Sequence, residues 1–150
     1  MHLEPEDQEY LRAELLAFLD RLGDPEARRP YDPLPAAVEA AEVPDDLLEP
    51  LGRVLDLSLS SGRLRRLHGP AAEMSANRLF RRTPQGRAIR ETLDEANLAL
   101  TGLRGQSIRS IDFAPRSPGT LTLSIETDRC RARFVVDAAG VRCQGVELDL

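Results

Sequence analysis

The sequence of 150 residues contains no lysine and no tryptophan, and all 20 of its basic side chains are arginines. Without lysine, the chain can form neither a Schiff base nor a lysine-bearing phosphate loop. Aromatic residues make up 4% of the chain, so the core must be aliphatic and few rings are present on which single-stranded nucleic acid could stack. No glycine-rich dinucleotide motif follows a predicted strand. We therefore expect no cofactor and assign no catalytic residues.

Long hydrophobic runs are also missing, and cysteine is scarce. No stretch approaches 18 consecutive apolar residues, and the first 20 residues carry several acids, so we expect a cytoplasmic protein that does not enter a membrane. The bias to arginine, alanine, proline and glycine is typical of a GC-rich bacterial genome. The two cysteines, Cys130 and Cys143, match no common zinc spacing, and we expect two core thiols without a metal.

Charge is distributed in blocks along the chain. Residues 1–50 hold 14 acids and 4 arginines, whereas residues 51–91 hold 3 acids and 9 arginines. Residues 92–150 are nearly neutral, with 8 acids and 7 arginines. An acidic segment followed by a basic one suggests a protein that contacts either itself or a charged partner.

The first block predicts an amphipathic helix over about residues 5–22, followed by a proline-rich connector over 24–44 with one short helical turn at 36–41. We expect residues 1–42 to form an arm that docks on the arginine-rich middle of its own chain or of another subunit. Residues 43–150 would then form an α+β core domain. We expect the acidic side chains of the arm to be solvated, with no buried pair.

Three further helices are predicted in the core domain. One begins at Pro50 and ends at 60–62, another opens at Gly69-Pro70, and a third opens at Thr83-Pro84 and runs to about Leu103. Beyond Gly105 the apolar period changes to two, which predicts about four strands in an antiparallel meander. The fold class is therefore α+β, with about four N-terminal helices packed on one face of the sheet.

The alternation of two strands fixes a register across their turn. It pairs Leu123 with Phe134 and Glu126 with Arg131, and the change of phase in the last strand predicts a bulge at Gly145. The opposite, polar face would carry arginines, and its candidate binding residues are Arg131, Arg133 and Arg142.

The other candidate binding residues lie in the basic block. They are Arg63, Arg65, Arg66, His68, Arg81, Arg82 and Arg87. The sequence 60–63, Ser-Ser-Gly-Arg, is one that can form an anion-binding nest. From these features we expect a non-catalytic accessory or scaffold protein that binds a protein partner through the arginine surface and the acidic arm. A sheet edge or a helix face could also mediate a homodimer.

Two other functions are also consistent with the sequence. Residues 78–88, Arg-Leu-Phe-Arg-Arg-Thr-Pro-Gln-Gly-Arg-Ala, resemble the segment that leaves the wing of winged-helix regulators of the multiple-antibiotic-resistance type, where a similar run opens a long helix. The resemblance covers about ten residues and implies a DNA-binding regulator. The second alternative is a small domain that binds an anion or another ligand.

Overall fold

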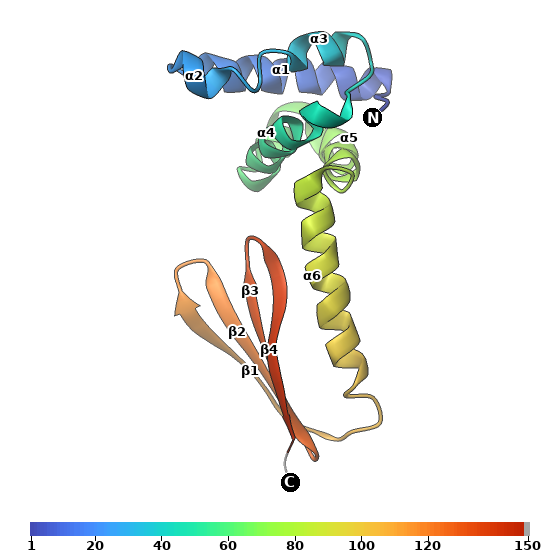
Figure 1. Cartoon of the computed structure of the whole chain (residues 1–150), viewed down its shortest axis with the longest axis vertical. Helices are drawn as coiled ribbons and strands as arrows, with labels where there is room; N and C mark the ends of the chain where they lie inside the picture. The colour runs from blue at the N-terminus through green and yellow to red at the C-terminus, as the bar shows by residue number, and fades with distance from the viewer. Residues whose placement is uncertain (149–150) are drawn as a thin grey trace. The chain divides into compact units, whose positions relative to one another are not determined.

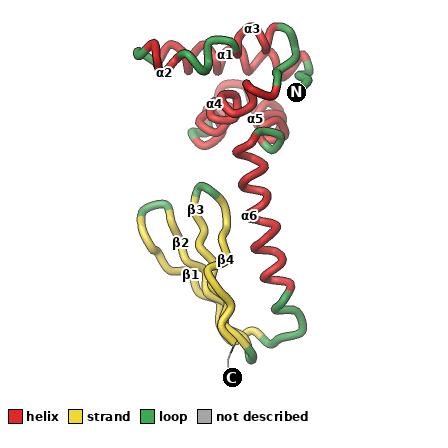
Figure 2. Tube along the Cα trace, viewed as in Figure 1, coloured by secondary structure: helices red, strands yellow, loops and turns green. Residues whose placement is uncertain are grey.

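The computed structural model describes residues 1–148 and shows an α+β protein whose helices precede its strands (Figures 1 and 2). The chain divides into two compact units, the first comprising Met1–Arg87 and the second beginning at Ala88. The elements in chain order are α1 (Pro5–Arg21), α2 (Pro25–Arg28), α3 (Leu34–Glu39), the 3-10 helix η1 (Asp45–Leu47), α4 (Leu48–Ser60), α5 (Arg63–Phe80), α6 (Pro84–Thr101), β1 (Ile108–Ser117), β2 (Thr120–Thr127), β3 (Cys130–Asp137) and β4 (Gly140–Leu148).

The proline-rich segment belongs to the core of the first unit. It forms α2 and α3, and Leu34 and Val38 of α3 are fully buried. Four of its five prolines stand where helices begin, because a missing N–H costs nothing there: Pro25 opens α2, Pro33 and Pro35 flank the start of α3, and Pro44 precedes η1. The sequence suggested a boundary between residues 42 and 43, whereas the contacts divide the chain between 87 and 88.

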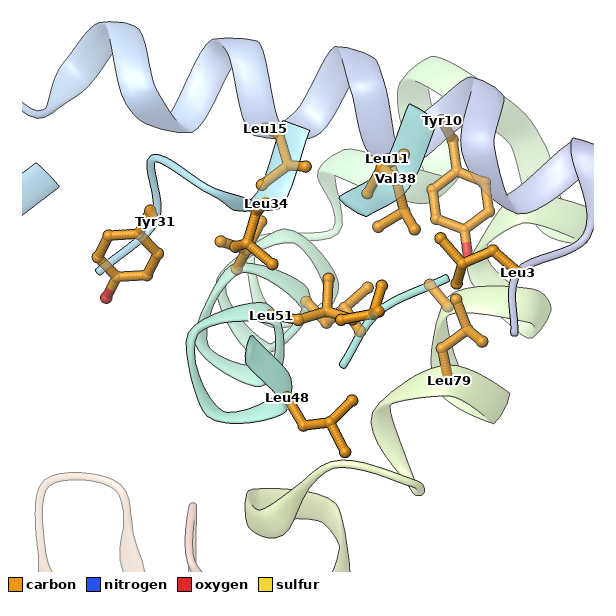
Figure 3. Packing of buried hydrophobic residues seen from close by; sticks show 14 of the residues in the cluster. Leu3, Tyr10, Leu11, Leu15, Tyr31, Leu34, Val38, Leu48, Leu51 and Leu79 are labelled. Carbon is orange, nitrogen blue, oxygen red and sulfur yellow. The ribbon is translucent and has the colours of Figure 1, made fainter. Parts of the chain in front are cut away.

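The first unit is built around one aliphatic core. In it α1 lies beside α3 and contacts α4 and α5, which also pack on each other (Figure 1). Leu11 and Leu15 of α1 point toward Leu51 of α4 in Figure 3, and all three are at most 1% exposed. The apolar stripe that predicted α1 is therefore the stripe that it buries.

The basic block is more helical than the sequence suggested. Residues 63–68, which we expected between two helices, form the first part of α5. Gly69 interrupts that helix with φ 85° and ψ 177°, and Pro70 opens its second part, as predicted. Because a positive φ strains residues that carry a Cβ, glycine permits this break at little cost.

The second unit contains the meander β1-β2-β3-β4. The predicted register is confirmed, since Leu123 pairs with Phe134 and Glu126 with Arg131. The bulge is also confirmed to within one residue: Arg133 pairs with Gly145 and Phe134 with Cys143, which leaves Gln144 as the extra residue. Helix α6 packs on the apolar face through Ala96 and Ala99, and Leu103, just beyond the end of the helix, joins the same cluster.

Both thiols lie on the covered side of the sheet, as expected, and neither forms a disulfide. Cys130 is 1% exposed, and its Sγ lies 3.3 Å from the side-chain oxygen of Gln106. Cys143 is half-buried beside Phe134. Within residues 1–148, no helix is long and apolar enough to cross a membrane.

Candidate functional site

Glu14 of α1 is a buried carboxylate that joins three segments of the first unit. Its side chain is 3% exposed and accepts hydrogen bonds from Ser58 Oγ at 2.8 Å and from Arg63 Nε at 3.1 Å. Nε2 of His68 lies 3.1 Å from the same carboxylate. Because each partner comes from α4 or α5, this one side chain ties α1 to both helices.

Asp7, two turns earlier on α1, forms a second buried cluster. It is 1% exposed and lies 3.1 Å from Nη2 of Arg78, with Ser75 Oγ donating a further hydrogen bond. The hydroxyl of Tyr10 also donates a hydrogen bond to Asp7 Oδ1, at 3.3 Å. Asp7 also accepts from the backbone N–H of Glu4, which caps α1.

These two clusters show that two acids of the arm are buried and that the arm packs on its own chain. The expectation that the acids of the arm are all solvated was wrong for Asp7 and Glu14. The arm does dock on the arginine-rich middle of its own chain, through Arg63 and Arg78. Spacing could have indicated this, because Asp7 and Glu14 lie four and three residues from Leu11 and so share its face of the helix.

A cleft of about 380 Å³ lies between α1 and α5, next to these clusters. Its lining includes Glu6, Glu9, Tyr10, His68 and Ser75. Burial raises the pKa of the Tyr10 phenol well above its ordinary value, so this hydroxyl keeps its proton at alkaline pH values at which an exposed phenol would ionise. His68 and Ser75 each point to a carboxylate of α1, which gives both residues a role in holding the helices together.

The turn between α5 and α6 carries Arg81 and Arg82, and the first turn of α6 carries Arg87. We call these three residues and the backbone that joins them the arginine turn. All three are exposed, and none forms an ion pair with another residue of the described chain, 1–148. They differ in this from Arg63 and Arg78, whose charges are neutralised by buried carboxylates. An exposed guanidinium with no acidic neighbour is available to a partner.

The backbone of the arginine turn is held firmly. Thr83 Oγ1 donates to the carbonyl of Phe80 at 2.7 Å and accepts from the N–H of Gly86 at 3.3 Å, which confirms Thr83 as the predicted cap of α6. A Cβ on Gly86 would lie 2.1 Å from the carbonyl oxygen of Phe80. Only glycine fits here without displacing backbone atoms.

A second contact fastens the turn to α4. Nε2 of Gln85 donates to the carbonyl of Glu49 at 2.9 Å. The same side chain lies across Gly52, where a Cβ would come within 2.1 Å of its Oε1. The arginines on either side of Gln85 are therefore carried by a rigid support.

The remaining predicted site residues are more dispersed. Arg65 lies 3.4 Å from Glu73, and Arg66 donates to the carbonyl of Ser61 at 3.1 Å. In the proposed anion nest Arg63 turns to Glu14, and the hydroxyls of Ser60 and Ser61 donate to helix carbonyls.

On the polar face of the sheet, Arg131 pairs with Glu126 and Arg142 with Asp137. Arg133 is exposed between them in the register. Two of these three charges are thus engaged within the sheet, in contrast to the arginine turn.

No family model matches the chain, and no curated protein or solved structure is significantly similar to it. The resemblance to winged-helix regulators is confined to the turn itself. Helices α4 and α5 precede it, and within residues 1–148 the strands of the sheet all follow Ser107, so no wing leads into the turn.

Proposed function

We propose that the protein is a non-catalytic accessory protein that binds an acidic surface of a partner protein through the arginine turn. The observation that carries this proposal is the contrast among the arginines of the basic block. Arg63 and Arg78 are neutralised within the chain, whereas Arg81, Arg82 and Arg87 are exposed without an acidic partner in residues 1–148.

The chemistry of arginine supports a binding role. A guanidinium remains protonated in proteins, so it cannot act as a general acid or base, but it binds carboxylates with two parallel hydrogen bonds. The rigid turn supports the same conclusion, because side chains on a fixed backbone lose less freedom when a partner binds.

The net charge favours a protein partner over DNA. The whole chain carries −5 at pH 7, and this charge repels a polyanion at long range. A partner with a limited acidic patch can meet the arginine turn without bringing a long row of phosphates near the acids of α1.

Fluorescence anisotropy with a short labelled peptide that carries a few glutamates among neutral residues tests the proposal on the full chain. We expect binding that weakens as salt rises, and a loss of about tenfold when Arg81, Arg82 and Arg87 are replaced by serine. A matched control replaces Arg12, Arg28 and Arg29, which are exposed arginines of the same unit in ion pairs with acids.

The control changes the net charge by the same amount, so it separates the surface from the total charge. Equal losses in the two triple variants would contradict the proposal. A labelled DNA duplex serves as the comparison probe, and tighter, strongly salt-dependent binding of the duplex would favour the DNA-binding alternative instead.

A further inference from the structure

The apolar face of the sheet is wider than the helix that covers it. The strand pairings align its inward residues in cross-strand rows, one of which reads Phe113, Leu123, Phe134 and Cys143. The buried cluster beneath α6 takes in Ile125, Ala132 and Phe134 of β2 and β3 with residues of β4, and no residue of β1. The inward residues of β1 thus lie outside the covered part.

On the β1 side of the sheet, four exposed inward residues form a set that we call the apolar flank. They are Ile108 (59% exposed), Ile111 (54%), Phe113 (65%) and Leu121 (43%). On the β4 side, Val146 (45%) and Leu148 (72%), which pair with the inward residues Ala132 and Cys130, are exposed as well. Soluble monomers rarely expose such a contiguous set of large apolar side chains, and a patch of this kind usually marks an interface.

Simple dimensions explain why the flank remains open. Four strands spaced about 4.8 Å apart present a face roughly 19 Å wide, including the width of the outer strands. One helix with its side chains is about 10 Å across and covers only about half of that width. A second layer of similar thickness is needed beside α6 to complete the core.

The β1 edge of the sheet, which borders the apolar flank, is poorly suited to pairing with a further strand, and this favours association of the flank through its face. Pro115 of β1 has no N–H to donate, and the pairing of β1 with β2 is irregular between Ile108 and Ser110 and again between Pro115 and Ser117. Proline and such irregularities are the usual protection of an edge strand against further pairing.

We propose that the apolar flank packs face to face on the same flank of a second copy of the chain. Sheets stack about 10 Å apart, close to the diameter of a helix, so the partner's sheet would fit in the same layer as α6. The flank carries no charged residue, and a two-fold contact therefore sets apolar atoms against apolar atoms without burying an unpaired polar group.

The exposed area agrees with a dimer. The flank exposes the equivalent of about two whole side chains, and the partly exposed Leu93 (41%) and Leu100 (37%) of α6 add most of a third. At about 150–200 Å² each, three side chains amount to roughly 500 Å². A standard interface takes about 800 Å² from each partner, of which a little over half is apolar.

Light scattering after size exclusion, over a dilution series of the full chain, tests this proposal. We expect a dimer that dissociates on dilution and is insensitive to salt, and we expect Ile111→Ser with Phe113→Ser to weaken it about tenfold or more. The control is Leu98→Ser, which removes a leucine of α6 that is 75% exposed and absent from the sheet contact.

A second measurement uses only the wild-type chain, in case the double variant does not fold. Hydrogen exchange above and below the dissociation concentration should show slower exchange in 108–117 in the dimer. A monomer at every concentration would overturn the proposal, as would a dimer that the double variant retains or that Leu98→Ser alone disrupts. Because the arginine turn lies elsewhere in the chain, the peptide-binding result is independent of this one.

Discussion

Nε2 of His68 lies 3.1 Å from Oε1 of Glu14, although 54 positions separate the two residues in the chain. The acidic first block and the basic second block therefore meet inside one unit. Their contact is made by few residues, with Asp7 and Glu14 as the buried acids and Arg63, His68 and Arg78 as their partners. Most of the other acids of the first block remain at the surface.

Replacing Glu14 by glutamine should destabilise the first unit by about 2–3 kcal/mol. The change leaves Arg63 and His68 facing a neutral amide, and removing one member of a buried pair costs up to about 3–5 kcal/mol. We expect less than that maximum because the Arg63 side chain is 30% exposed. Urea unfolding followed by circular dichroism measures the difference.

Glu39→Gln is the matched control for this experiment. Glu39 pairs with Arg12 at 2.8 Å, but its side chain is 61% exposed. Exposed pairs contribute about 1 kcal/mol or less, so the control should change stability little. Similar effects of the two substitutions would show that burial of Glu14 is not what gives the pair its strength.

Tyr10 should make stability depend on pH at the alkaline end. Burial raises the pKa of its phenol in the folded chain above the ordinary value near 10. The folded state therefore keeps the proton that the unfolded state loses, and the contribution is present below pH 10 and declines as the pH rises further. We expect the melting temperature to fall more steeply above pH 10 in the wild type than in Tyr10→Phe. Parallel curves would contradict this.

Gly86→Ala should disrupt the arginine turn. The added Cβ would lie 2.1 Å from the Phe80 carbonyl oxygen, so backbone must move at the start of α6. We expect a loss of about 2 kcal/mol or more and weaker binding of the acidic peptide. Gly23→Ala is the control, since no atom lies within 4 Å of its new Cβ. Unchanged melting of Gly86→Ala would show that the turn tolerates the shift.

The two cysteines should differ in reactivity. Cys143 is half-buried, whereas Cys130 is 1% exposed and contacts Gln106 and Thr127. Because alkylation requires access to the sulfur, a short treatment of the native chain should label Cys143 first. Mass spectrometry of the digested protein identifies the labelled thiol, and both should react in denaturant. Preferential labelling of Cys130 would be inconsistent with the packing around β3.

The sheet was the part of the fold that could be predicted most completely from the sequence. Strict alternation and a short turn allow one register, because a slip by one residue would turn Leu123 and Phe134 to the polar face. The connector was harder, since five prolines suggested an exposed segment with only one short helical turn, at 36–41. The segment also forms α2, and Leu34 and Val38 of α3 gain enough burial to hold it in the core.

The candidate site was also only partly predictable from the sequence. The sequence identified candidate arginines in the basic block, but it could not separate Arg63 from Arg81 and Arg82. The difference arises because Arg63 reaches the buried Glu14, 49 positions earlier. No local pattern contains that pairing.

By itself, the sequence determined the secondary structure of α1, α6 and the strands, because apolar period, caps and turns act over a few residues. Tertiary structure alone decided which charges are neutralised and how much of the sheet is covered. Both depend on side chains brought together from distant parts of the chain, as Glu14 is with His68, and Phe113 is left open because one helix is too narrow for four strands.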